Sequence, residues 1–139
     1  MPVATIDNVL IDNISRRNAI SAAAVNIAEQ LKGRAIVCES KSGATAASIA
    51  AFRPNLPLIS VTSVPRTAQQ LALSYASKSF VHPDGEKAGL EVAKMLHKQG
   101  YFHVDGDVTV VIVSGKQPGV TGKTDTIRVR TIRQDTESA

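Results

Sequence analysis

Two stretches of this sequence carry residue types that bind phosphate. Residues 40–45, Ser-Lys-Ser-Gly-Ala-Thr, offer three hydroxyls, one ammonium group and a glycine that lets a ligand approach the backbone closely. If this stretch opens a helix, its backbone N–H groups and the positive end of the helix dipole add to the same attraction. The alternative is an ordinary strand-to-helix turn in which Ser and Thr only cap the helix. Composition alone leaves both interpretations open.

The second stretch shifts the balance toward a ligand. Residues 115–124, Gly-Lys-Gln-Pro-Gly-Val-Thr-Gly-Lys-Thr, contain three glycines, two lysines and two threonines, and could close over the same anion. The stretch ends like a nucleotide-binding P-loop, but its preceding glycine is only three residues away and the segment that follows is predicted to be a strand. We therefore exclude a nucleotide P-loop and predict an anion site.

Other chemistry finds little support in the residue pattern. The sequence holds one cysteine and three histidines, Cys38, His82, His97 and His103. Their spacing matches no metal site, so we expect no metal, and we expect no cofactor. Cys38 lies in an apolar run, which favours a small buried side chain over a catalytic thiol. Asp105 and Asp107 could form an acid–base pair, but Asp-Gly-Asp before a strand is more typical of a turn, and we assign no catalytic residue.

Composition limits the kind of protein and of partner. With 139 residues, the chain can build one self-sufficient core but not two domains. The net charge is +4, yet the basic residues are scattered and tryptophan is absent, so we expect no nucleic-acid partner. Uncharged stretches such as residues 42–52 are far shorter than the ~20 apolar residues of a membrane span, and the first residues lack a secretory pattern. We therefore expect a cytoplasmic protein without a membrane partner.

Helices and strands are predicted to alternate along the chain. Apolar periodicity and the positions of glycine and proline predict helices over residues 19–32, 46–52, 65–75 and 90–99, and strands over residues 35–38, 58–62, 78–81, 108–113 and 126–132. This order predicts a three-layer α/β domain. The last strand alternates apolar residues with arginines, as expected for a half-exposed edge strand. Ligands of such sheets bind at the carboxyl ends of the strands, where both candidate loops would lie.

Several local features follow from the same pattern. We expect the first helix to begin after an N-cap at Asn18 and to stop at Gly33. Its predicted buried face consists of Ile20, Ala24, Ile27 and Leu31. The predicted buried face of helix 65–75 consists of Ala68, Leu71 and Ala72. We accordingly divide the chain into an N-terminal arm at 1–17, an α/β domain at 18–133 and a flexible tail at 134–139.

The order of these motifs resembles the C-terminal domain of pyruvate kinase. The resemblance covers residues 18–132 and rests on a series of motifs: Ala-Ile-Ser at 19–21, Ser-Lys-Ser-Gly at 40–43, Phe-Arg-Pro-Asn at 52–55, Val-Thr at 61–62, Gln69 with Leu71 and Ala72, and Gly-Asp at 106–107. It implies a mixed, mostly parallel five-stranded sheet between helices, with the last strand antiparallel. In pyruvate kinase this domain holds the allosteric effector site and contributes to the tetramer interface, whereas a separate barrel carries catalysis.

The resemblance also assigns the site residues. The effector-phosphate loop falls on Ser40, Lys41, Ser42, Gly43, Ala44 and Thr45, and the second effector loop contributes Lys116, Pro118, Gly119, Lys123 and Thr124. Relatives that bind fructose 1,6-bisphosphate hold its second phosphate with a Trp and an Arg before the fourth strand, and residues 82–107 contain neither. The expected ligand is therefore a small metabolite with one phosphate, or phosphate or sulfate itself.

The function expected from this resemblance is that of a regulatory, effector-binding domain which forms a homo-oligomer. In a full-length enzyme it would serve pyruvate kinase in glycolysis, and without the barrel we expect no pyruvate kinase activity from the 139 residues. Two alternatives stay open. The chain could be a small enzyme that acts on a phosphorylated metabolite, or a purely structural interaction domain.

Overall fold

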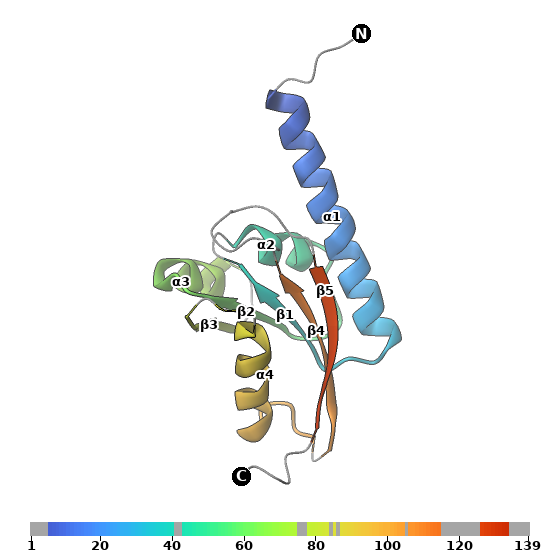
Figure 1. The fold of residues 1–139 in the computed structure, drawn as a ribbon, viewed down its shortest axis with the longest axis vertical. Helices are drawn as coiled ribbons and strands as arrows, with labels where there is room; N and C mark the ends of the chain where they lie inside the picture. The colour runs from blue at the N-terminus through green and yellow to red at the C-terminus, as the bar shows by residue number, and fades with distance from the viewer. Residues whose placement is uncertain are drawn as a thin grey trace.

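The fold consists of four helices and five strands among the residues described in a computed structural model. These residues are 6–40, 43–74, 78–83, 85, 87–104, 106–114 and 126–133. In chain order the elements are α1 (Ile6–Gln30), β1 (Ala35–Glu39), α2 (Ala44–Ala51), β2 (Leu58–Thr62), α3 (Pro65–Ser74), β3 (Lys78–Val81), α4 (Ala88–Lys98), β4 (Val108–Ser114) and β5 (Thr126–Ile132). The predicted alternation of helices and strands is confirmed (Figure 1).

The strands form one mixed sheet in the order β3-β2-β1-β4-β5. Strand β1 pairs in parallel with both β2 and β4, β2 pairs in parallel with β3, and β5 runs antiparallel along β4. The central strands read as continuous apolar runs because both faces of the sheet are covered. The expected sheet, with its antiparallel last strand at an edge, is therefore confirmed.

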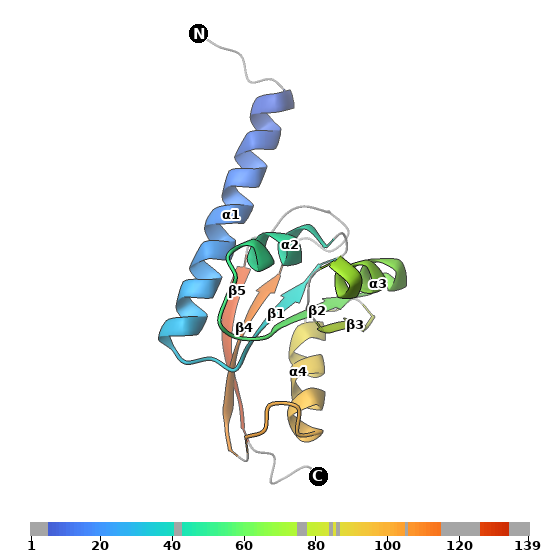
Figure 2. The same ribbon diagram turned by 180° about the vertical axis from the view of Figure 1, so that it is seen from behind.

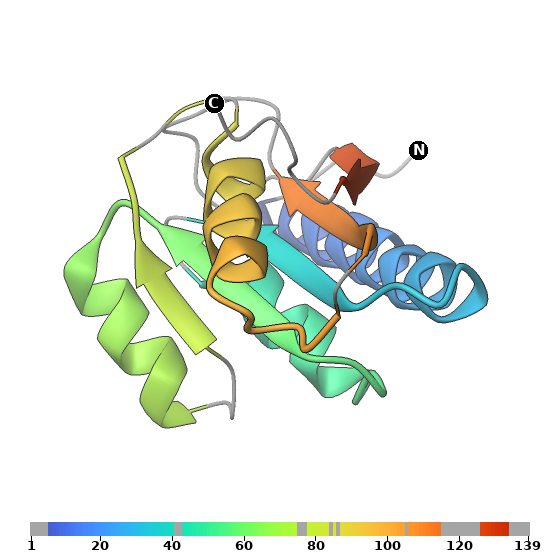
Figure 3. The same ribbon diagram turned by 90° about the horizontal axis from the view of Figure 1, so that it is seen from below.

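Helices cover the two faces of the sheet and make three layers. Seen from below, α4 lies on one face, and α1 and α2 lie on the other (Figure 3). Alternate side chains of β1 point to opposite faces of the sheet. Ile36 and Cys38 pack in the cluster with α1 and α2, and Val37 packs in the cluster with α4. Cys38 is fully buried, as expected for a small apolar side chain.

Helix α1 begins earlier than predicted. It starts at Ile6, and its N-terminal half extends beyond the sheet (Figures 1 and 2). The predicted N-cap at Asn18 is therefore wrong: Asn18 lies inside the helix, and its Oδ1 accepts a hydrogen bond from the Ser48 hydroxyl of α2 at 2.9 Å. The sequence did not predict this start because residues 6–17 mix charged and amide side chains with aliphatic ones in no sustained period.

The buried face of α1 differs from the predicted one at the C-terminal end of the helix. The residues buried against the sheet and α2 are Ser21, Ala24, Val25 and Ala28, while Leu31 is 53% exposed. Ala24 is buried as predicted, and Ile20 and Ile27 are partly buried and pack against the same cluster. Leu31 lies beyond the last helical residue, where the chain turns through Lys32 at a φ of 55°.

Helix α3 buries fewer residues than predicted. Ala68 and Leu71 are buried, but Ala72 is exposed, and so is Leu73 beside it. The helix lies at the β3 end of the sheet and has no further layer outside it (Figure 3). The prediction that Ala72 is buried is therefore wrong, because an edge helix can bury only the stripe that faces the sheet.

Candidate anion-binding site

The first candidate loop connects the end of β1 to the start of α2. The Ser40 N–H donates to the Val61 carbonyl of β2 at 3.0 Å, which continues the sheet by one residue. The Ser40 Oγ then accepts the Gly43 N–H at 2.9 Å. Gly43 takes a left-handed conformation, with a φ of 85°, and the helix begins at the next residue. A serine hydroxyl and a left-handed glycine therefore turn the chain from strand to helix.

Gly43 is needed for its size as well as its conformation. A Cβ at this position would lie 3.1 Å from Leu71 Cδ2 and 3.5 Å from Thr67 Cγ2, both on α3. Such a Cβ would also sit on a backbone with positive φ, which L-residues rarely adopt. The loop is thus fitted closely against the neighbouring helix.

The structure gathers four predicted residues of this loop at the start of α2. Ser40, Gly43, Ala44 and Thr45 lie in sequence around the helix N-terminus, and Thr45 is buried. Lys41 and Ser42 lie outside the described residues. The first turn of α2 holds no acidic residue, so the helix itself brings no carboxylate to its own start.

The second candidate loop leaves and re-enters the sheet beside the first. Its predicted ligands, Lys116, Pro118, Gly119, Lys123 and Thr124, lie outside the described residues. Its two stems are described, because Ser114 ends β4, Thr126 begins β5, and these two residues are partners in the antiparallel ladder. Glu39 of β1 is in turn the parallel partner of Ser114. The stems of both candidate loops therefore stand on adjacent strands at one edge of the sheet.

A carboxylate at this edge escaped the sequence analysis. Glu39, the last residue of β1, accepts the Gly89 N–H of α4 on Oε2 at 2.6 Å, and its Oε1 lies 3.4 Å from Arg128 Nη2 of β5. Arg128 Nη2 is also 3.3 Å from Ser114 Oγ. The sequence offered one signal for this group, a glutamate at the end of an apolar run. Its partners could not be predicted, because they are 50 and 89 positions away along the chain.

Burial governs the proton affinity of this carboxylate. Burial raises the pKa of Glu39 above its ordinary value and outweighs the Gly89 N–H, Arg128, Ser114 and His82, which lower it. Burial also raises the pKa of the neighbouring Cys38 thiol, and the charge of Glu39 adds to that rise. A thiol held protonated is a poor nucleophile, which supports the structural interpretation of Cys38.

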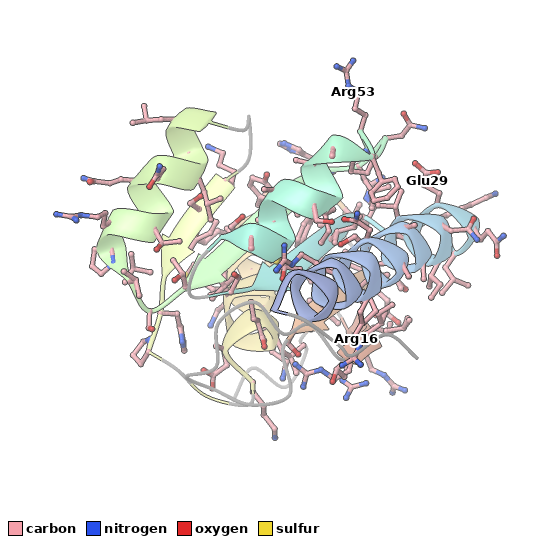
Figure 4. All side chains as sticks on the ribbon, turned by 90° about the horizontal axis from the view of Figure 1, so that it is seen from above. Arg16, Glu29 and Arg53 are labelled. Atoms are coloured by element: carbon pink, nitrogen blue, oxygen red, sulfur yellow. The ribbon has the colours of Figure 1, made fainter. Side chains whose placement is uncertain are left out.

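A shallow pocket lies at the opposite edge of the sheet. It measures about 610 Å³ and is lined by residues that precede β1, β2 and β4, among them Arg34, Pro57 and His103. Glu29 also lines it, where the Asn55 N–H donates to Glu29 Oε2 at 3.2 Å. Figure 4 shows Glu29 on the side of α1 that faces the end of α2, where Arg53 points outward, and Arg16 on the other side of α1. This pocket is therefore remote from the candidate loops.

Within the part of the chain that the structure describes, no group of three or more His, Cys, Asp or Glu residues could hold a metal ion. No helix among those residues is long and apolar enough to cross a bilayer.

The fold and the loop stems together define an α/β domain of the kind that places ligand loops at the carboxyl ends of parallel strands. The chain matches the family described as "Pyruvate kinase, alpha/beta domain" over residues 18–130, and it belongs to that family. The resemblance to the pyruvate kinase C-terminal domain is therefore confirmed.

Individual pyruvate kinases show the same relationship. The chain is 36% identical to the pyruvate kinase of Corynebacterium efficiens over 125 residues, which is 88% of this chain and 26% of that enzyme. It is 35% identical to pyruvate kinase 2 of Synechocystis over 118 residues, 84% of this chain and 20% of that enzyme. It is 34% identical to the pyruvate kinase of Mycobacterium tuberculosis over 131 residues, 87% and 26% respectively. The chain spans about a quarter of the length of the relatives it matches.

Proposed function

We propose that this chain is a regulatory domain of the pyruvate kinase type which binds a small phosphorylated metabolite between residues 40–45 and 115–124. The observation that carries the proposal is the adjacency of the loop stems, since Glu39 pairs with Ser114 and Ser114 pairs with Thr126. Two loops rich in hydroxyls, glycine and lysine thus start from neighbouring strands. In a full-length cytoplasmic pyruvate kinase, such a domain would regulate the last phosphate transfer of glycolysis.

The start of α2 supplies the physical basis for anion binding. A phosphate placed there would replace the Ser40 Oγ as acceptor of the Gly43 N–H and meet the positive end of the helix. Lys41 from the first loop, and Lys116 or Lys123 from the second, would add charge-assisted hydrogen bonds. Because these lysines can neutralise one phosphate group, ligands with one phosphate should bind about as tightly as fructose 1,6-bisphosphate.

Calorimetry with a Lys41→Ala variant tests this proposal. A charge-assisted contact to a partly exposed phosphate contributes about 1.5–3 kcal/mol, so Lys41→Ala should weaken a sugar monophosphate or inorganic phosphate roughly tenfold or more. Lys94→Ala removes the same charge from an exposed position on α4 and should leave the affinity unchanged. Added salt should weaken binding to the wild-type chain. Equal affinity of both variants, or a bisphosphate that binds a hundredfold tighter, would contradict the proposed pocket.

The same samples separate the two alternative functions. A small enzyme acting on a phosphorylated metabolite would produce new signals in the phosphorus NMR spectrum of the mixture, whereas a binding domain would only shift or broaden the signals of the ligand. A structural interaction domain would bind none of the phosphometabolites. A coupled assay with phosphoenolpyruvate, ADP, magnesium and potassium should show no turnover by the 139 residues alone.

We also propose that copies of the domain associate through β5. This strand is an edge of the sheet, so among the described residues no strand pairs with one side of its backbone, and Val129 on it is 40% exposed. Two copies could pair their β5 strands about a twofold axis. Light scattering at high protein concentration should give a mass above 14.7 kDa, and a monomeric mass would contradict this proposal.

A further inference from the structure

The buried carboxylate of Glu39 makes contacts that an external anion would make. It accepts the N–H of Gly89, the second residue of α4, at 2.6 Å. N–H groups in the first turn of a helix have no acceptor within the helix and attract anions. Only 15% of the Glu39 side chain is exposed, so this contact is shielded from solvent. The start of α4 thus already holds a negative charge from the protein itself.

The contact between Glu39 and α4 depends on the absence of a side chain at Gly89. A Cβ there would lie 2.5 Å from Glu39 Oε2 and 3.1 Å from Val37 Cγ1. Both distances are shorter than a carbon atom normally tolerates, so any other residue would push the carboxylate or the helix away. The glycine allows the carboxylate to reach the backbone N–H.

Arg128 lies beside the stems of the two candidate loops, on the face of the sheet that α4 covers. Its Nη2 lies 3.4 Å from Glu39 Oε1 and 3.3 Å from Ser114 Oγ. Glu39 immediately precedes the first loop, Ser114 immediately precedes the second, and Arg128 is the third residue of the strand that follows it. A quarter of the Arg128 side chain is exposed, but its Nε is buried, so a ligand would have to meet one of the terminal nitrogens.

The charged groups around Glu39 come from several elements. Arg128 of β5 is its ion-pair partner, and the charge of His82, which follows β3, acts on it at longer range. His82 itself is engaged by α4, because its Nε2 lies 3.1 Å from Glu91 Oε1. Its Nδ1 lies 2.8 Å from the Pro83 carbonyl. Cys38 is the neighbouring titratable group on β1.

We propose that Arg128 is a further anion-binding residue of the site and that Glu39 is an internal carboxylate which holds Arg128 while no ligand is bound. This inference rests on the proposed function. A bound anion would draw the guanidinium from Glu39, and the carboxylate would then take up a proton because it would remain buried without its counter-ion. Anion affinity should therefore rise as the pH falls through the pKa of Glu39.

Inorganic sulfate is the probe for this linkage, because its charge does not change between about pH 4 and about pH 8, whereas that of phosphate does. Affinities are measured at constant ionic strength, since salt alone weakens such contacts. Arg128→Gln should weaken sulfate binding roughly tenfold. Arg130→Gln is the matched control: it removes the same charge from the same strand, where Arg130 Nη1 bonds only the neighbouring Val129 carbonyl among the contacts seen, and it should change the affinity less than twofold.

A second variant keeps the inference testable if Arg128→Gln fails to fold. Glu39→Gln removes the competing charge, so it should bind sulfate several-fold more tightly at about pH 8 and show a weaker pH dependence than wild type. In the wild-type chain the NMR signal of the Gly89 amide should move with pH as the carboxylate titrates, and in Glu39→Gln this movement should be lost.

The outcomes separate the inference from the proposed function. If the wild-type chain binds neither sulfate nor phosphate, the proposed function fails, and this inference fails with it. If wild type binds and Lys41→Ala does not, yet Arg128→Gln and Glu39→Gln both bind as wild type does, the inference alone is overturned. Weaker binding by Arg128→Gln together with tighter binding by Glu39→Gln supports both.

Discussion

At the starts of α2 and α4, backbone N–H groups that lack an acceptor within the helix are bonded by different side chains. Both helices begin at the carboxyl edge of the sheet, on opposite faces, and two consecutive residues at the end of β1, Glu39 and Ser40, contact their starts. The neutral Ser40 hydroxyl accepts the Gly43 N–H just before α2. The Glu39 carboxylate accepts the Gly89 N–H in the first turn of α4. A helix start with a built-in anion has little need of another. The helix start with only a hydroxyl is the one that we propose takes a ligand.

The difference depends on the pleat of β1. Successive side chains of a strand point to opposite faces, so Glu39 turns toward α4 and Ser40 toward α2. An exchange of these two residues would exchange the chemistry of the two helix starts. The comparison predicts measurable differences between variants at the two positions.

The largest effect is expected at the α4 start. Gly89→Ala should lower the free energy of unfolding by about 3 kcal/mol, because the added Cβ would displace the Glu39 carboxylate from the Gly89 N–H and press on Val37. Gly85→Ala is the control, since a Cβ there meets nothing within 4 Å. Chemical denaturation measures both, and equal stabilities of the two variants would show that α4 is not fitted to the carboxylate.

A smaller effect is expected at the α2 start. Gly43→Ala should cost about 2 kcal/mol, because the backbone has a positive φ and the new Cβ presses on Leu71. Gly100→Ala shares the positive φ but faces open space, so it should cost only about 1 kcal/mol. The difference between the two midpoints of thermal unfolding isolates the contact with α3. No difference would mean that the loop does not depend on that contact.

The pH dependence of stability should distinguish the two helix starts, because the α4 start contacts a titratable carboxyl group and the α2 start contacts a neutral hydroxyl. A carboxyl group whose pKa is raised in the folded state contributes stability below its ordinary pKa and loses that contribution as the pH rises through the raised value. Relative to wild type, Glu39→Gln should therefore become more stable as the pH is increased from about 4 to about 8. Urea denaturation across this range checks the sign. A gain in the opposite direction would show that Arg128 and Gly89 outweigh burial.

The smallest effect concerns the bond that ties α1 to α2. Asn18→Ala loses an exposed hydrogen bond to Ser48 but places a better helix former inside α1, so stability should stay within about 0.5 kcal/mol of wild type. Loss of an N-cap would instead cost typically ~1 kcal/mol. Circular dichroism during thermal unfolding separates the two values, and a clear loss would show that the helix starts at Asn18 in solution.

Much of the fold could be read from the pattern of residues because the signals are local. β-branched runs, proline and glycine predicted all five strands and their order along the chain. The predicted helix over residues 90–99 stops before Gly100, and Gly100 does follow the end of α4, with a φ of 83° and its N–H donated to the His97 carbonyl. The start of α1 was missed, because its first residues mix charged, amide and aliphatic side chains in no sustained period.

The sequence by itself determined the hydroxyl, glycine and lysine content of the two candidate loops, because these features belong to consecutive residues. The tertiary structure alone decided that Glu39 would meet Gly89 and Arg128, since a parallel sheet brings together side chains from β1, α4 and β5 that no local period connects. It also decided which residues of α1 and α3 are buried, because the closeness of packing and the position at a sheet edge depend on neighbouring elements. Local propensity specifies elements, but contacts between distant residues specify a buried charge and its partners.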